Sequence, residues 1–172
     1  MNARTIVGNT LAVALFATML FAFFVHERDK AASASLSEEH VTQIRVDYAL
    51  KKAKAQRKYL MIEFGADWCD DCRVLAQNLA DSSIRQYFER YFNLLKIDIG
   101  HSDRNFAAAQ RVGLDLSHGI PAVVVYSPDG ARIGATNDGE LEPARTYRPQ
   151  QVLAFLKAIV DRQSITNPSD FQ

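Results

Sequence analysis

Cysteine is scarce in this chain of 172 residues, which contains two, Cys69 and Cys72. A framework of several disulfides, as in many small secreted domains, is therefore excluded. An excess of charge of one sign is also missing, because Lys plus Arg and Asp plus Glu both count 20. Without a basic field to attract phosphates, nucleic-acid binding is not expected. A metal site is not expected either, since zinc normally takes four ligands and a second Cys-x-x-Cys pair is lacking.

Glycine and proline are few as well, with eight and five residues, and the sequence contains no internal repeat or low-complexity tract. These features exclude fibrous and disordered classes of protein. The composition, 48% hydrophobic and 23% charged, is typical of one ordinary globular domain with an appended segment.

The appended segment lies at the N-terminus. Residues 6–25 form a run of twenty residues without a charge, between Arg4 and a charged cluster that begins at His26. A helix of that length spans roughly the 30 Å of the hydrocarbon layer of a bilayer. The apolar core of a cleaved signal is usually shorter, about 7–15 residues. Residues 1–30 are therefore predicted to be a retained transmembrane anchor.

Alternatives to this anchor remain open. Ala32-Ser33-Ala34 matches the small-residue pattern of a signal cleavage site, in which case the protein would be cleaved and secreted. A buried core helix is disfavoured because the run lacks a polar face. The Lys and Arg count on the two sides does not decide the orientation. Exported bacterial domains commonly begin with such a head and apolar run, so we expect a single-pass protein of the inner membrane whose domain faces the periplasm or exterior, joined by a tether over residues 31–37.

The rest of the chain alternates helical and strand patterns over residues 38–162 and leaves residues 163–172 as a tail. Helices are expected from Ser37 to about Lys58, after Cys72, at 84–91, at 106–112 and from Pro149, and strands at 59–64, 93–99, 122–126 and 131–136. Residues 127–130 would turn the last two strands into a hairpin. Strands joined by helices pair in parallel and hairpin strands pair antiparallel, so we expect an α/β fold with a mixed central sheet flanked by helices. The polar loop at 137–148 has no role that its sequence indicates.

The motif Trp68-Cys69-Asp70-Asp71-Cys72 follows a predicted strand and opens a predicted helix. Two intervening residues bring both sulfurs close enough to bond. The free N–H groups of a helix N-terminus lower the pKa of a thiol placed there, so Cys69 is the expected nucleophile and Cys72 the resolving cysteine. A disulfide that only clips a turn and a metal-binding pair are the alternatives.

The segment from Glu63 to Cys72, Glu-Phe-Gly-Ala-Asp-Trp-Cys-Asp-Asp-Cys, resembles the active-site segment of the thioredoxin superfamily. Its Ala-Asp-Trp-Cys portion is similar to the C-terminal thioredoxin-like domain of bacterial thiol:disulfide interchange transporters. Gly119-Ile120-Pro121, before a predicted strand, resembles the second hallmark of the superfamily, an Ile-Pro bond held cis beside the cysteines. The resemblance runs from about residue 41 to residue 160. It implies a thioredoxin-like fold and thiol–disulfide exchange with no cofactor beyond the redox-active disulfide.

The same resemblance implies roles for further residues. Trp68 would cover one side of the disulfide, and the Ile120 backbone beside Pro121 would bind an extended substrate segment by strand addition. Glu63 matches a buried carboxylate that relays a proton to the resolving cysteine. A carboxyl in an otherwise apolar strand should have a raised pKa, which suits proton transfer, unless the strand lies at an edge and Glu63 faces water. His118 would either tune the site or simply be solvated.

Asp70 and Asp71 replace the Gly-Pro of ordinary thioredoxins, and Gly65 replaces a bulky aromatic residue. Two carboxylates beside Cys69 disfavour its thiolate, so a reductant is expected rather than a strong oxidant. The predicted function is a membrane-bound protein-disulfide reductase, or electron-passing protein, outside the cytoplasm. Its partners would be proteins with disulfides and an upstream thiol donor. The alternatives are a disulfide oxidase or isomerase, and a binding module at the Pro121 groove or a copper carrier without turnover.

Overall fold

The computed structural model describes residues 3–162, and within them the side chains of residues 16–30 and 38–162. The chain divides into two compact units, Met1–Glu38 and Glu39–Gln172. Helix α1 (Ala3–Gln56) contributes to both units. It continues without a break through residues 31–37, so the helix start predicted at Ser37 is not present and the predicted tether is helical. Within a continuous helix the backbone N–H groups are bonded to the preceding turn and need no cap.

The predicted membrane span cannot be followed over its whole length. In the part of the chain whose side chains are described, no helix is long and apolar enough to cross a bilayer. The first half of the predicted span, residues 6–15, lies outside that part. The predicted tail at residues 163–172 lies outside the described residues as well.

A four-stranded sheet forms the centre of the second unit, with the strand order β2-β1-β3-β4. The strands are β1 (Tyr59–Gly65), β2 (Phe92–Asp98), β3 (Ala122–Tyr126) and β4 (Arg132–Ala135). Strand β1 pairs in parallel with β2 and antiparallel with β3, and β3 pairs antiparallel with β4. The predicted mixed sheet and hairpin are therefore confirmed. Strand β1 lies inside the sheet, and all of its residues are buried.

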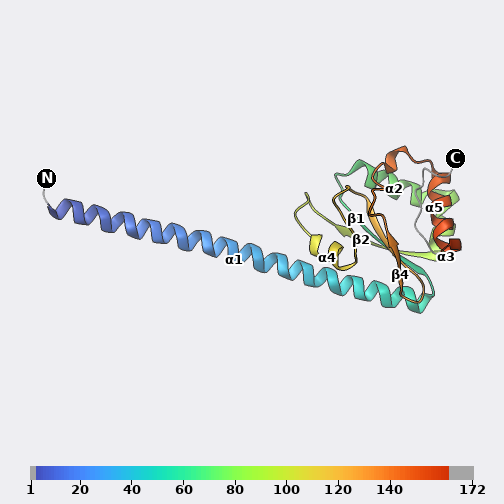
Figure 1. Cartoon of the computed structure of the whole chain (residues 1–172), viewed down its shortest axis with the longest axis horizontal. Coiled ribbons are helices and arrows are strands. Elements are labelled where there is room, and N and C mark those ends of the chain that lie inside the picture. The colour runs from blue at the N-terminus through green and yellow to red at the C-terminus, as the bar shows by residue number, and fades with distance from the viewer. Residues whose placement is uncertain (1–2, 163–172) are drawn as a thin grey trace. The chain divides into compact units, whose positions relative to one another are not determined.

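Helices pack on both faces of this sheet (Figure 1). They are α2 (Asp70–Ala80), α3 (Ser82–Tyr91), α4 (Phe106–Arg111) and α5 (Pro149–Arg162), with a short 3-10 helix η1 (Ala144–Thr146). Successive residues of a strand point to opposite faces. Leu60 and Ile62 therefore lie in a buried cluster with residues of α1 and α4. Met61 lies in the other cluster, with residues of α2, α3 and α5.

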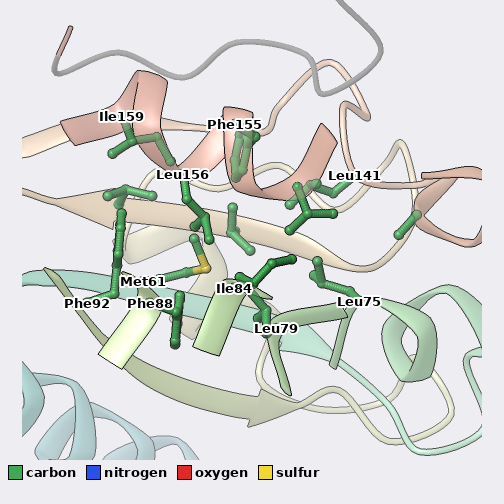
Figure 2. Close-up of a cluster of buried hydrophobic side chains, with 14 of the residues drawn as sticks. Met61, Leu75, Leu79, Ile84, Phe88, Phe92, Leu141, Phe155, Leu156 and Ile159 are labelled. Carbon is green, nitrogen blue, oxygen red and sulfur yellow. The ribbon is translucent and has the colours of Figure 1, made fainter. Parts of the chain in front are cut away.

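This second cluster fixes the helix that carries the cysteines. Figure 2 shows side chains of α5 lying over Met61 of β1, close to Ile84 of α3 and to Leu75 and Leu79 of α2. Full burial of a large apolar side chain contributes about 1.5–3 kcal/mol to stability. Leu141, from the loop without a predicted role, is completely buried in the same cluster. Helix α2 is thus held by the sheet, by two helices and by that loop.

Candidate active site

Cys69 and Cys72 form a disulfide across the first turn of α2, with Cα atoms 5.3 Å apart. Cys69 is the N-cap of the helix, and its Sγ accepts a hydrogen bond of 3.1 Å from the backbone N–H of Cys72. Strand β1 ends at Gly65, only a few residues before Cys69. The position of β1 in the sheet therefore places the Cys69 sulfur beside the free backbone N–H groups at the N-terminus of α2. Such N–H groups and the helix dipole stabilise a thiolate. This geometry favours Cys69 as the attacking sulfur.

Ile120 and Pro121 lie beside the disulfide. The peptide bond between them is cis, as the resemblance implies. The carbonyl oxygen of Ile120 lies 3.5 Å from Cys69 Sγ, although the two residues are 51 positions apart in the sequence. The backbone just before β3 therefore borders the sulfur that is placed to react.

Trp68 lies next to the disulfide with 49% of its surface exposed. Its indole Nε1 donates a hydrogen bond of 2.6 Å to the carbonyl oxygen of Gly100, and its ring stacks on His101 with 6.1 Å between the ring centroids. Gly100 has a φ of +59°, and a Cβ there would collide with the side chain of Asp103. The loop after β2 thus holds Trp68 in place. Nothing in the sequence indicates the contacts with Gly100 and His101.

Glu63 lies in the interior strand β1 and is 2% exposed, so its alternative placement on an edge strand facing water is wrong. Lys96 of β2 is its partner in the register, and Lys96 Nζ lies 3.5 Å from Glu63 Oε2. Burial raises the pKa of Glu63 above its ordinary value, and the charge of Lys96 offsets only part of this effect. The predicted raised pKa is confirmed. Sequence reasoning missed Lys96, although a cation in an apolar strand pattern is a signal for a buried acid nearby.

Glu63 and Cys72 border the same space. A Cβ added to Gly65 would lie 3.1 Å from Cys72 Sγ and 3.4 Å from Glu63 Oε1. All three residues line an open pocket of about 330 Å³. The pocket is large enough to hold water, through which a proton could pass between the carboxyl and the sulfur.

Asp71 is buried and paired with Arg145, which weakens the expected effect of its negative charge on the Cys69 thiolate. The side chain of Arg145 donates to both of its oxygens, from Nε to Oδ1 at 3.1 Å and from Nη2 to Oδ2 at 2.6 Å. The backbone N–H of Arg145 also donates to Asp71 Oδ1, at 2.8 Å. Burial alone would raise the pKa of Asp71, but the hydrogen bonds and charge of Arg145 outweigh it, and the pKa lies below its ordinary value. The negative charge near Cys69 is therefore largely compensated.

Asp70 and His118 lie at the surface. Asp70 pairs with Arg73 one turn along α2, and more than half of each of these side chains is exposed. Solvent screens such a pair, so Asp70 also acts weakly on Cys69. His118 is exposed. Within the described residues, no group of three or more His, Cys, Asp or Glu side chains is arranged to hold a metal ion.

The loop at 137–148 has a role that its sequence does not indicate. It contains η1, buries Leu141 and Ala144 in the core, and supplies Arg145 to the first turn of α2. Asn78 of α2 donates a further hydrogen bond of 3.3 Å to the carbonyl oxygen of Tyr147. The loop therefore binds helix α2 at Asp71 and Asn78 and fixes its position.

A mixed sheet covered by helices, a disulfide at the N-terminus of the helix after β1 and a cis-proline beside it define a thioredoxin-fold thiol–disulfide oxidoreductase. A family model described as thioredoxin-like matches residues 41–128, which is half of the chain, and the chain belongs to this family.

Known proteins are similar to parts of the chain that range from about half of it to two thirds. Thiol:disulfide interchange protein DsbD 1 of Pseudomonas aeruginosa is 34% identical over 92 residues, which are 52% of this chain and 15% of that protein. Thioredoxin of Buchnera aphidicola is 29% identical over 89 residues, which are 50% of this chain and 74% of that protein. A solved structure of a disulphide isomerase from Xylella fastidiosa is 36% identical, with a TM-score of 0.66 over 69% of this chain and 91% of that one. The chain thus matches a small part of the interchange protein and nearly the whole of the isomerase structure.

Proposed function

We propose that this protein reduces disulfides in other proteins, or passes electrons to them, outside the cytoplasm and held at a membrane by its N-terminal segment. The observation that carries the proposal is Cys69 Sγ at the N-cap of α2, accepting the N–H of Cys72 and facing the Ile120 carbonyl. A reactive thiolate beside an accessible backbone edge is what an extended disulfide substrate requires. The uncharged run at residues 6–25 supports the membrane location.

The proposed reaction has two exchange steps. The Cys69 thiolate attacks a substrate disulfide, forms a mixed disulfide and releases one substrate sulfur as a thiolate. Cys72 then transfers its proton towards Glu63 and attacks Cys69 Sγ, which releases the second substrate sulfur. The Cys69–Cys72 disulfide remains, and a thiol donor must reduce it before the next turnover.

The direction of exchange depends on how stable the reduced form is. Strong oxidants of this kind have an unusually stable thiolate. Here Arg145 is paired with Asp71 and Arg73 with Asp70, so neither cation adds uncompensated positive charge near Cys69. We expect a reduction potential below about −200 mV, and a value above about −150 mV would favour an oxidase.

Reduction of insulin by the full chain, with dithiothreitol as donor, tests the proposal. The wild-type protein should accelerate the reaction, and Cys69→Ser should return it to the uncatalysed rate because the attacking sulfur is gone. Cys72→Ala should instead accumulate a mixed disulfide with the substrate, since the resolving sulfur is missing. A Cys69→Ser variant that kept its activity would show that Cys69 is not the nucleophile.

A disulfide isomerase is the second candidate, because the solved structure that covers most of this domain is described as one. In an isomerase, Cys69 would attack a substrate disulfide, and a substrate thiol would release it again before the Cys69–Cys72 disulfide forms. Refolding of a protein with scrambled disulfides distinguishes the two candidates, since a pure reductase returns free thiols and an isomerase returns native pairs.

A further inference from the structure

The resolving sulfur can also be approached from the side of Glu63, away from the edge proposed for protein substrates. Cys72 lines the pocket of about 330 Å³, which lies between α2 and the end of the β1–β2 pair. Ile120 is not among its lining residues, so it is distinct from the edge proposed for protein substrates. A molecule in this pocket would meet Cys72 rather than Cys69.

Two small residues keep this route open. Gly65 lacks the Cβ that would press on Cys72 Sγ at 3.1 Å, and Ala76 of α2 lines the pocket as well. A bulky side chain at Gly65, as the resemblance implies for thioredoxins, would fill the space that leads to the sulfur. The opening is therefore a property of this chain's own residues.

The pocket also contains an acceptor for a proton. Glu63 is only 2% exposed, and its Oε2 atom makes no hydrogen bond among the described residues, with only the ammonium of Lys96 at 3.5 Å. A buried carboxylate oxygen without a hydrogen bond is costly, and an incoming thiol would provide one. The pocket thus places a base beside the sulfur that a thiol would attack.

We propose that a low-molecular-weight monothiol enters this pocket and reduces the disulfide by attack on Cys72. The thiol proton passes to Glu63, a bond forms between the incoming sulfur and Cys72 Sγ, and the Cys69–Cys72 bond breaks with its electron pair on Cys69. A second thiolate then attacks the sulfur of the first, which yields the small disulfide and a Cys72 thiolate that recovers the proton from Glu63. Two thiols are oxidised and one protein disulfide is reduced.

The choice of leaving group supports attack on Cys72. A sulfur that can leave as a stable thiolate leaves faster. Attack on Cys72 expels Cys69, whose sulfur already accepts the Cys72 N–H at the helix N-terminus. This proposal rests on the proposed function in one respect: the small thiol would be the donor that reduces the Cys69–Cys72 disulfide before the next turnover.

Reduction of the oxidised full chain by 2-mercaptoethanol, a small neutral thiol, tests this route. Trp68, the one tryptophan of the chain, lies beside the disulfide and reports the reaction by fluorescence. Ala76→Leu should slow the reaction about tenfold, which corresponds to ~1.4 kcal/mol, while insulin reduction with dithiothreitol in excess is unchanged. Gln77→Leu, an exposed neighbour outside the pocket, is the matched control and should change neither rate. Gly65→Ala narrows the same space from β1 and should also slow reduction by 2-mercaptoethanol, but its insulin rate is not used as a control because Gly65 borders both Glu63 and Cys72.

Acid quenching followed by peptide mapping identifies the attacked sulfur. We expect the first mixed disulfide with 2-mercaptoethanol on Cys72. A mixed disulfide on Cys69, or equal reduction rates in wild type, Ala76→Leu and Gly65→Ala, would overturn the proposal. A protein that is inactive on insulin but forms the Cys72 adduct would instead overturn the proposed function and leave this route standing.

Discussion

Glu63 is the residue on which proton transfer in this site depends. It is buried in the interior strand, it has one cation nearby, and it shares a pocket with Cys72. A carboxyl with a raised pKa changes its protonation closer to neutral pH than an ordinary glutamate, which is where thiol exchange operates. Two properties, kinetics and stability, should therefore respond to its removal.

Glu63→Gln should slow the resolution of the mixed disulfide, because a neutral amide cannot accept the proton of Cys72. General-base groups typically contribute 10²–10⁴-fold, so a loss of about 100-fold is expected, largest near neutral pH. Single-turnover kinetics from about pH 6 to about pH 9, a range that includes the ordinary Cys pKa of about 8.5, measure it. Identical rates in wild type and variant across this range would remove Glu63 from the mechanism.

The same substitution should make the protein more stable at high pH. A raised pKa means that the folded state binds the Glu63 proton more tightly than the unfolded chain, so wild-type stability falls as pH rises from about 4.3 through the folded pKa. Glu63→Gln avoids this loss. Urea unfolding should show little difference near pH 4 and a higher free energy of unfolding for the variant than for the wild type at pH 8.

Lys96→Gln provides the opposite control for this experiment. It removes the cation that partly compensates the buried carboxylate, so it should lower stability at pH 8 and have less effect near pH 4. A Glu63→Gln variant less stable than wild type at pH 8 would mean that the ion pair with Lys96 outweighs the cost of burial.

At the scale of elements, the loop at 137–148 and helix α2 behave as one part. Arg145 supplies side-chain and backbone hydrogen bonds to Asp71, and Leu141 joins the apolar cluster under the helix. The Arg145 side chain is largely exposed and the Asp71 side chain is buried. Removing Arg145 therefore leaves a buried charge without its partner, whereas removing Asp71 leaves a charge that solvent can reach. Their pairing decides the charge that Cys69 experiences from the first turn of α2.

Removing the charge of Arg145 and removing the charge of Asp71 should move the reduction potential of the Cys69–Cys72 pair in opposite directions. Arg145→Gln leaves Asp71 uncompensated, which disfavours the Cys69 thiolate and lowers the potential. Asp71→Asn leaves the cation uncompensated, which stabilises the thiolate and raises it. Shifts of about 10–20 mV are expected, on a scale where 30 mV is ~1.4 kcal/mol for a two-electron couple. Equilibration with glutathione buffers measures them.

Asp70→Asn is the matched control in that experiment. Asp70 is more than half exposed and paired with Arg73, so its removal should shift the potential less than either change at the buried pair. Shifts of the same sign in Arg145→Gln and Asp71→Asn would contradict the electrostatic explanation.

At the scale of the whole molecule, the redox domain is confined to the second compact unit. Its sheet, both apolar clusters and every residue of the site lie between residues 39 and 162. The first unit consists of the N-terminal segment, in which the uncharged run at 6–25 predicts an anchor. The predicted anchor and the redox site therefore lie in different units of the chain.

An alkaline phosphatase fusion after Lys30 tests the predicted topology. The fusion should be active in a bacterial host, and the full chain should sediment with membranes, because the run can span the bilayer and place the redox domain outside the cytoplasm. An inactive phosphatase would reverse the orientation. Soluble protein beginning at Ser35 would show cleavage after Ala34, as the Ala32-Ser33-Ala34 pattern allows.

The sequence by itself determined the features that depend on local periodicity and spacing. Alternating and helical apolar patterns predicted the order of strands and helices, and the Cys69–Cys72 spacing at a helix start predicted the disulfide. These features are predictable because backbone geometry repeats every two or about 3.6 residues and the free N–H groups lie in a known turn. The start of α1 was predicted wrongly at Ser37, since a good capping residue does not interrupt a helix whose preceding turn already continues it.

The tertiary structure decided which distant groups meet. Arg145 reaches Asp71 across 74 positions, Ile120 reaches Cys69 across 51, and Lys96 lies opposite Glu63 only because β1 and β2 pair in that register. No local sequence pattern indicates any of these three contacts. Each one forms because the sheet or the loop at 137–148 brings distant parts of the chain together. The charge near Cys69 and the protonation of Glu63 are therefore properties of the fold, since burial and long-range partners set both.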